Sequence, residues 1–179
     1  RYVDEYNLSN YDASVLTSDK AISDYFDNVI NSDFSLKASS KIVVNWITSE
    51  LFSILNENNL EIINSPIKPK DLGKLVKLIN EDIISGKIAK EVLIEMFNTT
   101  SDPQIIIDKK GLKQVTNTDE IEAFVDEVIE ENKKMVEQYL SGKDKLLGFF
   151  VGQSMKKSKG KANPQILNEI IKKKLSKKN

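Results

Sequence analysis

Cysteine and histidine are both missing from this sequence of 179 residues. Without cysteine the chain can form no disulfide and offers no thiolate nucleophile or thiolate metal ligand. Without histidine it lacks the side chain that most often serves as a general base near neutral pH and as a zinc ligand. Few hydrolytic mechanisms remain open to such a chain.

Long apolar runs are missing as well. No stretch approaches the roughly 20 residues needed to cross a bilayer, and the N-terminus lacks the charged-then-apolar layout of a secretory signal. We therefore expect a cytoplasmic protein with no membrane partner. The chain begins at Arg1 and not at methionine, and it enters structured sequence at once, so we also expect a piece of a longer polypeptide.

Glycine and proline are scarce, with seven and four residues respectively. Most apolar residues recur at spacings of three and four, which is the period of an amphipathic helix, and no segment shows the alternation of a strand. The sequence therefore predicts an all-α protein. Residues 38–56 form the most apolar predicted helix, which belongs at the centre of a bundle with Trp46 as a core anchor.

The polar segment 111–118 is the best candidate for a linker between domains. A boundary there predicts a larger N-terminal helical bundle over residues 1–114 and a compact C-terminal tail domain over 115–179. Three to four helices are expected in the tail, the first of them behind a Thr118 cap and the last beginning at Pro164. A core of about 60 residues is marginal, so we expect a partner to add stability.

Charge is distributed unevenly along the chain. The formal net charge is −1, yet residues 142–179 contain 11 lysines against only Asp144 and Glu169. A phosphate backbone binds such a surface through release of its counterions. The alternative is a solvated lysine face, because lysine forms helices well and is favoured near their C-termini. The lysines closest together in this region are Lys156, Lys157, Lys159 and Lys161 around Gly160, and Lys172, Lys173 and Lys174 one helix later.

Two further features of the basic region admit two interpretations each. Gly148 and Gly152 stand four residues apart on one predicted helix face, where they allow close approach of another helix, which we favour, or of a sugar-phosphate chain. Asn163 precedes Pro164 at a helix start, whose free backbone N–H groups could receive an anion. A plain helix cap is the simpler interpretation of Asn163.

Other motifs carry little chemistry. The acidic pairs Asp126/Glu127 and Glu130/Glu131 lie between apolar helix positions, so we expect them to be solvated and not catalytic. The segment Ser85-Gly86-Lys87 lacks the first glycine and the final Ser/Thr of a phosphate loop, so a helix cap explains it better. Phe149 and Phe150 fall on apolar helix faces, which favours the core over base stacking.

Four segments are distinctive when taken together: YDASVLTSDKAISDYFD at 11–27, NWITSELFSILNE at 45–57, ISGKIAKEVLIEM at 84–96 and GFFVGQSMKKSKGKANPQILNEIIKKKL at 148–175. In this order they resemble the C-terminal region of the B subunits of bacterial aspartyl/glutamyl-tRNA amidotransferases, the GatB/YqeY family. The resemblance covers nearly the whole chain.

This resemblance implies a parent enzyme that converts Glu-tRNA(Gln) or Asp-tRNA(Asn) to the correctly charged amide. ATP and Mg²⁺ are its implied cofactors, and its A and C subunits are implied partners, with the former supplying glutamine-derived ammonia. In the family the reactions take place in the N-terminal domain of the B subunit. This segment is therefore implied to hold no catalytic residue, metal or cofactor, and to bind tRNA(Gln), tRNA(Asn) or both, but not DNA.

Charge assigns the expected tRNA contacts, with Gly160 allowing close backbone approach and Asn163 at a helix N-terminus. Two alternatives remain: a scaffold that docks neighbouring amidotransferase or synthetase subunits, and a stand-alone YqeY-type protein. The expected tRNA contacts are Lys143, Lys156, Lys157, Lys159, Gly160, Lys161, Asn163, Lys172 and Lys173.

Overall fold

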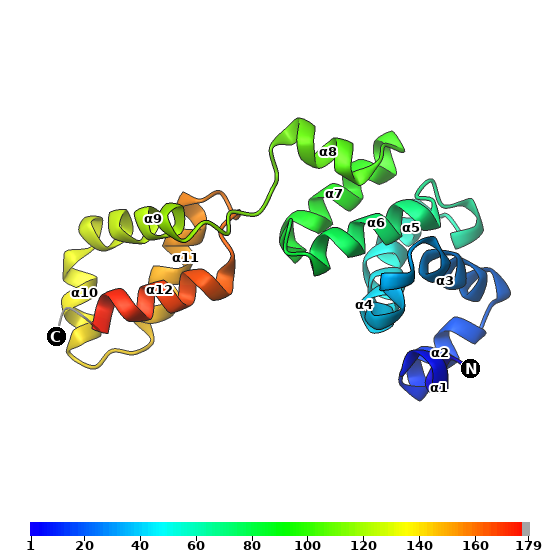
Figure 1. Ribbon diagram of the computed structural model, residues 1–179, viewed down its shortest axis with the longest axis horizontal. Coiled ribbons are helices and arrows are strands. Elements are labelled where there is room, and N and C mark those ends of the chain that lie inside the picture. Colours follow the sequence, from blue (N-terminus) through cyan, green and yellow to red (C-terminus); the bar gives the residue numbers. More distant parts are fainter. Residues whose placement is uncertain (177–179) are drawn as a thin grey trace. The chain divides into compact units, whose positions relative to one another are not determined.

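A computed structural model describes residues 1–176, and these residues are helical almost throughout (Figure 1). Contacts divide the chain into two units, the first spanning Arg1–Leu112 and the second beginning at Lys113. The sequence placed this division two residues further on, between residues 114 and 115. Within the described residues the only β-type pairing is one isolated bridge, so the predicted all-α class is confirmed.

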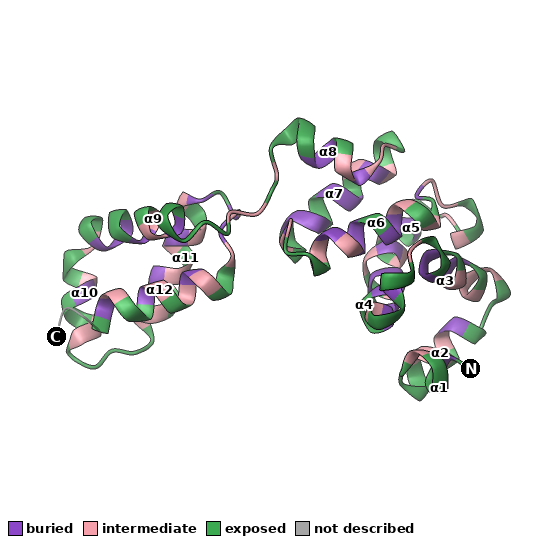
Figure 2. Cartoon of the chain, viewed as in Figure 1, coloured by how far each residue is buried: buried purple, intermediate pink, exposed green. Residues whose placement is uncertain are grey.

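The first unit is built around helices whose buried sides face one another (Figure 2). None of the helices within residues 1–176 is long and apolar enough to cross a membrane. In chain order the elements of this unit are α1 (Tyr2–Tyr6), α2 (Asn10–Thr17), α3 (Lys20–Ser32), the 3-10 helix η1 (Phe34–Ser39), α4 (Ser40–Asn45), the π-helical η2 (Trp46–Leu51), α5 (Phe52–Glu57), the 3-10 turn η3 (Ile62–Asn64), α6 (Pro69–Asn80), α7 (Gly86–Thr99) and α8 (Pro103–Lys110).

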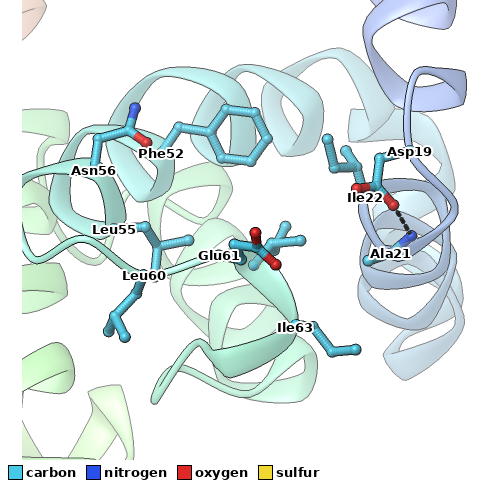
Figure 3. Close-up of a pocket in the computed structure, with 10 residues that line it drawn as sticks. Asp19, Ala21, Ile22, Phe52, Leu55, Asn56, Leu60, Glu61 and Ile63 are labelled. Carbon is cyan, nitrogen blue, oxygen red and sulfur yellow. Dashed lines mark hydrogen bonds between the residues drawn. The ribbon is translucent and has the colours of Figure 1, made fainter.

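Short polar side chains determine where several of these helices begin. At the start of α3, Asp19 Oδ1 accepts a hydrogen bond from the Ala21 backbone N–H at 2.8 Å (Figure 3). At the start of α7, Ser85 Oγ accepts from the Ile88 N–H at 3.2 Å. Each bond satisfies a donor that has no partner inside the helix. The Ser85-Gly86-Lys87 segment is therefore a helix cap, as predicted, and not a phosphate loop.

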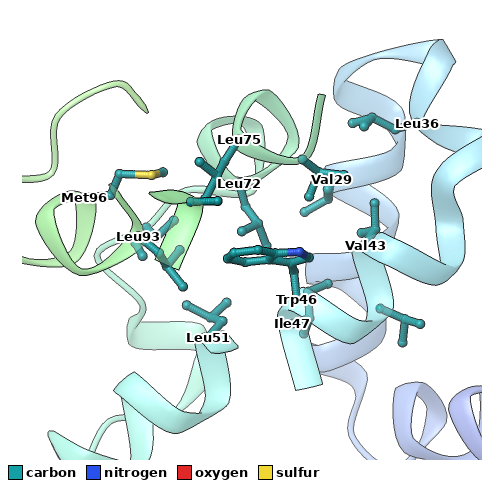
Figure 4. Packing of buried hydrophobic residues seen from close by; sticks show 14 of the residues in the cluster. Val29, Leu36, Val43, Trp46, Ile47, Leu51, Leu72, Leu75, Leu93 and Met96 are labelled. Carbon is teal, nitrogen blue, oxygen red and sulfur yellow. The ribbon is translucent and has the colours of Figure 1, made fainter. Parts of the chain in front are cut away.

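The core of the first unit surrounds the helical stretch from α4 to α5. Trp46 is only 8% exposed, which confirms it as a core residue, and side chains of α6 and α7 lie around it (Figure 4). The sequence predicted one regular helix over residues 38–56, but η2 in its middle is a π-helical turn. Val43, Ile47, Leu51 and Leu55 are all buried, and their spacing of four drifts around a regular helix. The wider π-turn reduces this drift.

Within residues 113–176 the second unit contains four helices, in agreement with the three to four predicted for the tail domain: α9 (Thr118–Glu131), α10 (Lys133–Leu140), α11 (Leu146–Lys157) and α12 (Pro164–Ser176). Helices α9, α11 and α12 pack against one another over a core that includes Val125, Phe150 and Ile171. The predicted cap was wrong by one residue, because Asn117 Oδ1 accepts from the N–H groups of Asp119 and Glu120 at 2.9 and 3.2 Å. Thr118 is the first residue inside α9.

Candidate nucleic-acid interface

The turn between α11 and α12 carries several of the predicted tRNA contacts. Helix α11 ends with two closing hydrogen bonds, from Lys159 N to Lys156 O at 3.0 Å and from Gly160 N to Met155 O at 2.8 Å. This is the Schellman pattern, which needs a left-handed residue after the helix. Lys159 has φ of 56° and Gly160 has φ of 76°. Gly160 is buried, so its role in this turn is conformational.

Lys159 stands where glycine is usually found. A left-handed conformation costs about 1 kcal/mol or more for a side chain that carries a Cβ. Strain of this kind persists where the surrounding structure enforces it, and it is often found at functional positions. The conformation holds the exposed Lys159 side chain on the turn, directly after the lysines that end α11.

The turn is held firmly by the chain that enters the second unit. Val115 N–H donates to Lys161 O at 2.7 Å, and Asn163 N–H donates to Val115 O at 3.0 Å. Asn163 Oδ1 also accepts from the backbone N–H groups of Gln165 and Ile166, each at 3.1 Å. Asn163 is therefore the plain cap of α12, and it occupies donors that an anion would otherwise meet.

The lysines around the turn fall into two groups. Lys156 and Lys159 are exposed and Lys161 is half-buried, and none of the three forms an ion pair within residues 1–176. Lys157 differs, because its Nζ donates to Glu127 and Glu131 of α9, both at 2.8 Å. These two hydrogen bonds, with Glu127 the larger cause, raise the pKa of Lys157. The ammonium group of Lys157, one of the predicted tRNA contacts, is thus paired with two carboxylates of α9.

The remaining predicted contacts lie away from the turn. Lys143 precedes α11, and Lys172 and Lys173 lie on the last turns of α12, all three exposed. Lys172 follows Pro164 by eight residues, or about 12 Å along the helix. The structure therefore gathers Lys156, Lys159 and Lys161 but not the full predicted set.

The acidic face of α9 does not match the expectation of simple solvation. Besides the two partners of Lys157, Glu122 and Asp126 pair with Lys174 of α12, and the hydrogen bond to Glu122 is the main cause that raises the pKa of Lys174. Glu130 pairs with Lys133 at 2.7 Å. These carboxylates remain exposed, yet most of them are engaged with lysines that lie far away in the sequence.

The outer face of α11 is bare. A Cβ added at Gly148 or Gly152 would meet no atom within 4 Å, so no helix of the described residues packs closely there, contrary to the interpretation that we favoured. Lys145 and Lys156 lie at helical spacing from these glycines and so share their face. Lys145 was missed by the sequence analysis, although its position three residues before Gly148 was a signal. We name Lys145, Gly148, Gly152 and Lys156 the glycine face.

Pockets in the first unit offer little chemistry. The pocket in Figure 3 has a volume of about 230 Å³ and its carboxylates are Asp19 and Glu61. Asp19 already caps α3. Nowhere in the described part of the chain do three or more His, Cys, Asp or Glu side chains gather as a metal ion would need. Large apolar side chains that remain exposed include Tyr11, Phe34 and Ile63.

Comparison with known proteins gives a clear family match. The GatB domain family (GatB_Yqey) matches residues 24–175. The chain is 49% identical over 175 residues to the B subunit of the aspartyl/glutamyl-tRNA(Asn/Gln) amidotransferase of Pelagibacter ubique, covering 98% of this chain and 35% of that protein. The protein of the same description from Thermoanaerobacter sp. is 47% identical over 178 residues, 99% of this chain and 36% of its own length. The chain thus spans about a third of these relatives.

Proposed function

Since the chain belongs to the GatB domain family, we propose that it is the tRNA-binding part of the B subunit of an aspartyl/glutamyl-tRNA amidotransferase. In this role it binds mischarged tRNA(Gln) or tRNA(Asn) in the cytoplasm and positions it for amide formation elsewhere in the complex. The A and C subunits meet it through the parent protein. The chemical steps do not belong to this segment.

The observation that carries the proposal is the glycine face together with the adjoining turn. Two exposed glycines on a helix cost about 1 kcal/mol each relative to alanine, and no packing contact among the described residues of the second unit offsets that cost. Lys156, Lys159 and Lys161, which form no ion pair within residues 1–176, follow directly. A-form RNA presents phosphates and 2′-hydroxyls along a wide, shallow minor groove, and it is recognised mainly by shape. A smooth helix face with Lys145 at one end and Lys156 at the other suits that surface.

Binding at a distance from the reaction can still assist it. Contacts with the body of the tRNA fix its orientation, so the aminoacylated 3′ end arrives as part of an already ordered complex. ATP and Mg²⁺, which the family implies, do not fit the described residues of this chain, because no suitable carboxylate cluster or phosphate loop is present there. No reaction step is therefore assigned to side chains of this segment.

Binding of the chain to tRNA(Gln) and tRNA(Asn) across a salt series tests this proposal. For a polyanion contact, log K falls linearly with log salt. The variant with Lys156→Gln, Lys159→Gln and Lys161→Gln should bind more weakly, with the slope reduced by about 2–3. A matched control neutralises Lys41, Lys70 and Lys87, which are exposed lysines of the first unit, and should keep most of the affinity. Salt-independent binding, or an equal loss in both variants, contradicts the proposal.

A second function has its own supporting observation. Phe34 is 89% exposed, Tyr11 76% and Ile63 74%, all in the first unit. Large apolar side chains at the surface are typical of protein contacts. A scaffold that docks neighbouring subunits would retain those subunits in pull-down experiments while showing no tRNA binding, and it would lose them when these residues are changed to serine.

A further inference from the structure

Helix α9 is acidic along its whole length. Between Thr118 and Glu131 it contains seven carboxylates and no cation. Its apolar residues face the core, so the carboxylates occupy the remaining surface on both sides of the helix. Glu127 and Glu131 reach α11 on one side, and Glu122 and Asp126 reach α12 on the other.

Each lysine held by α9 has two carboxylate partners. Lys157 lies between Glu127 and Glu131, and its side chain is 31% exposed. Lys174 lies between Glu122 and Asp126, with 28% exposure. A phosphate near either ammonium would also lie near two negative charges, and the repulsion offsets most of the attraction. These lysines therefore contribute little to a surface for a polyanion.

The neighbouring lysines are not held in this way. Consecutive residues on a helix point about 100° apart, so Lys156 projects away from the side on which Lys157 meets α9. Lys156 is exposed and forms no ion pair with any residue that the structure describes. Within residues 113–176 the lysines beside α9 are thus paired with carboxylates, whereas those at the α11–α12 turn and the exposed Lys172 and Lys173 are not, a difference that the sequence alone does not show.

We propose that the acidic face of α9 masks Lys157 and Lys174 and repels RNA, so that tRNA binds the second unit away from α9, across the glycine face and the α11–α12 turn. This inference rests on the proposed function and adds which side of the second unit faces the RNA. The carboxylates act as specificity determinants: they prevent the sugar-phosphate backbone from lying along α9. Without them the unit would bind polyanions in several orientations.

Neutralising the two carboxylate partners of Lys157 tests whether they keep this lysine from contacting RNA. Glu127→Gln with Glu131→Gln keeps the side-chain shape and releases Lys157, and exposed ion pairs contribute too little to stability for the fold to depend on them. We expect tRNA to bind roughly three- to tenfold more tightly, with the salt slope steeper by about 1, because one more cation becomes available to phosphate. Glu91→Gln with Glu137→Gln changes net charge equally at exposed positions that form no ion pair within residues 1–176, and it should have a smaller effect.

A double-mutant cycle isolates the lysine. Lys157→Gln alone should change the tRNA dissociation constant by less than about twofold, whereas the same change in the Glu127→Gln/Glu131→Gln background should remove the gain. Lysine-modification footprinting provides an independent measurement: tRNA should protect Lys156 and Lys159 but not Lys157 or Lys174. A large loss of tRNA affinity from Lys157→Gln in the wild-type chain, or protection of Lys157 by tRNA, overturns the proposal that α9 masks this lysine. Absence of any tRNA binding by the wild-type chain overturns the proposed function instead.

Discussion

Glycines in this chain lie in three different surroundings. Gly73 allows α6 to approach α3, because a Cβ there would lie 2.5 Å from Ser32 Oγ and 3.0 Å from Leu36 Cδ1. Gly160 provides a left-handed turn conformation. Gly148 and Gly152 meet neither need, since they lie in a regular helix with open space around them. A residue type that looks the same in the sequence therefore has different structural causes at Gly73 and Gly160, and none within the described residues at Gly148 and Gly152.

The glycine face should respond to alanine in two opposite ways. Gly148→Ala with Gly152→Ala should raise the free energy of unfolding by about 1–2 kcal/mol, because each alanine removes a helix penalty of roughly 0.5–1 kcal/mol and clashes with nothing. The same methyl groups should weaken tRNA binding if the RNA backbone passes close to the helix. Urea unfolding and tRNA titration measure the two effects on one protein.

Gly73→Ala provides the matched control for that experiment. Its methyl group enters a packed contact, and overpacking typically costs about 1–3 kcal/mol, which outweighs the helix gain. We expect this variant to lose stability while its tRNA affinity at low temperature is unchanged. A more stable Gly73→Ala protein, or a destabilised Gly148→Ala/Gly152→Ala protein, would contradict the assignment of these contacts.

At the scale of elements, the starts of several helices depend on one capping side chain each. Asn117 accepts two backbone N–H groups at the start of α9, while Thr118 lies one residue inside the helix. Asn117→Ala should therefore lower the free energy of unfolding of the second unit by about 1 kcal/mol. Thr118→Ala should stay within about 0.5 kcal/mol of wild type. Chemical denaturation of both variants decides which residue is the cap.

Elements were predictable from the sequence to the extent that their causes are local. Apolar periodicity predicted the helix that became α9, and Pro164 marked the start of α12, because these signals act within a few residues. The π-turn at Trp46–Leu51 was missed, although the buried spacing of four from Val43 onward was a local sign of it.

The candidate site was less predictable, because its charges are paired across long sequence separations. Lys157 meets Glu127 and Glu131 across 30 and 26 residues. Helical spacing placed Gly148 and Gly152 on one face but could not tell whether a partner helix covered it. Only the packing of α9, α11 and α12 determines which lysines are free.

At the scale of the whole chain, two units with separate cores should respond separately to a ligand. The only tryptophan, Trp46, lies in the core of the first unit, so its fluorescence reports that unit alone (Figure 4). A ligand that binds one folded unit raises that unit's stability by mass action, about 2.7 kcal/mol at one hundred times the dissociation constant. Saturating tRNA should therefore stabilise only the second unit.

Hydrogen exchange followed by mass spectrometry measures this directly. Amides in the helices from α9 onward should exchange more slowly with tRNA present, while those of α3 to α7 should be unchanged and the Trp46 unfolding transition should keep its midpoint. Equal protection of both units would show that tRNA also contacts the first, and it would contradict a binding role confined to the second.

The hydrogen bonds that Val115 makes with Lys161 and Asn163 have a mechanical consequence. They join the incoming polypeptide to the α11–α12 connection before α9 begins. Tension applied through residue 113 is therefore carried first by these two bonds, and only later by the first turn of α9. A force transmitted through the segment that enters at residue 113 and a force from a tRNA bound at Lys159 would therefore act on the same short stretch of backbone from opposite ends.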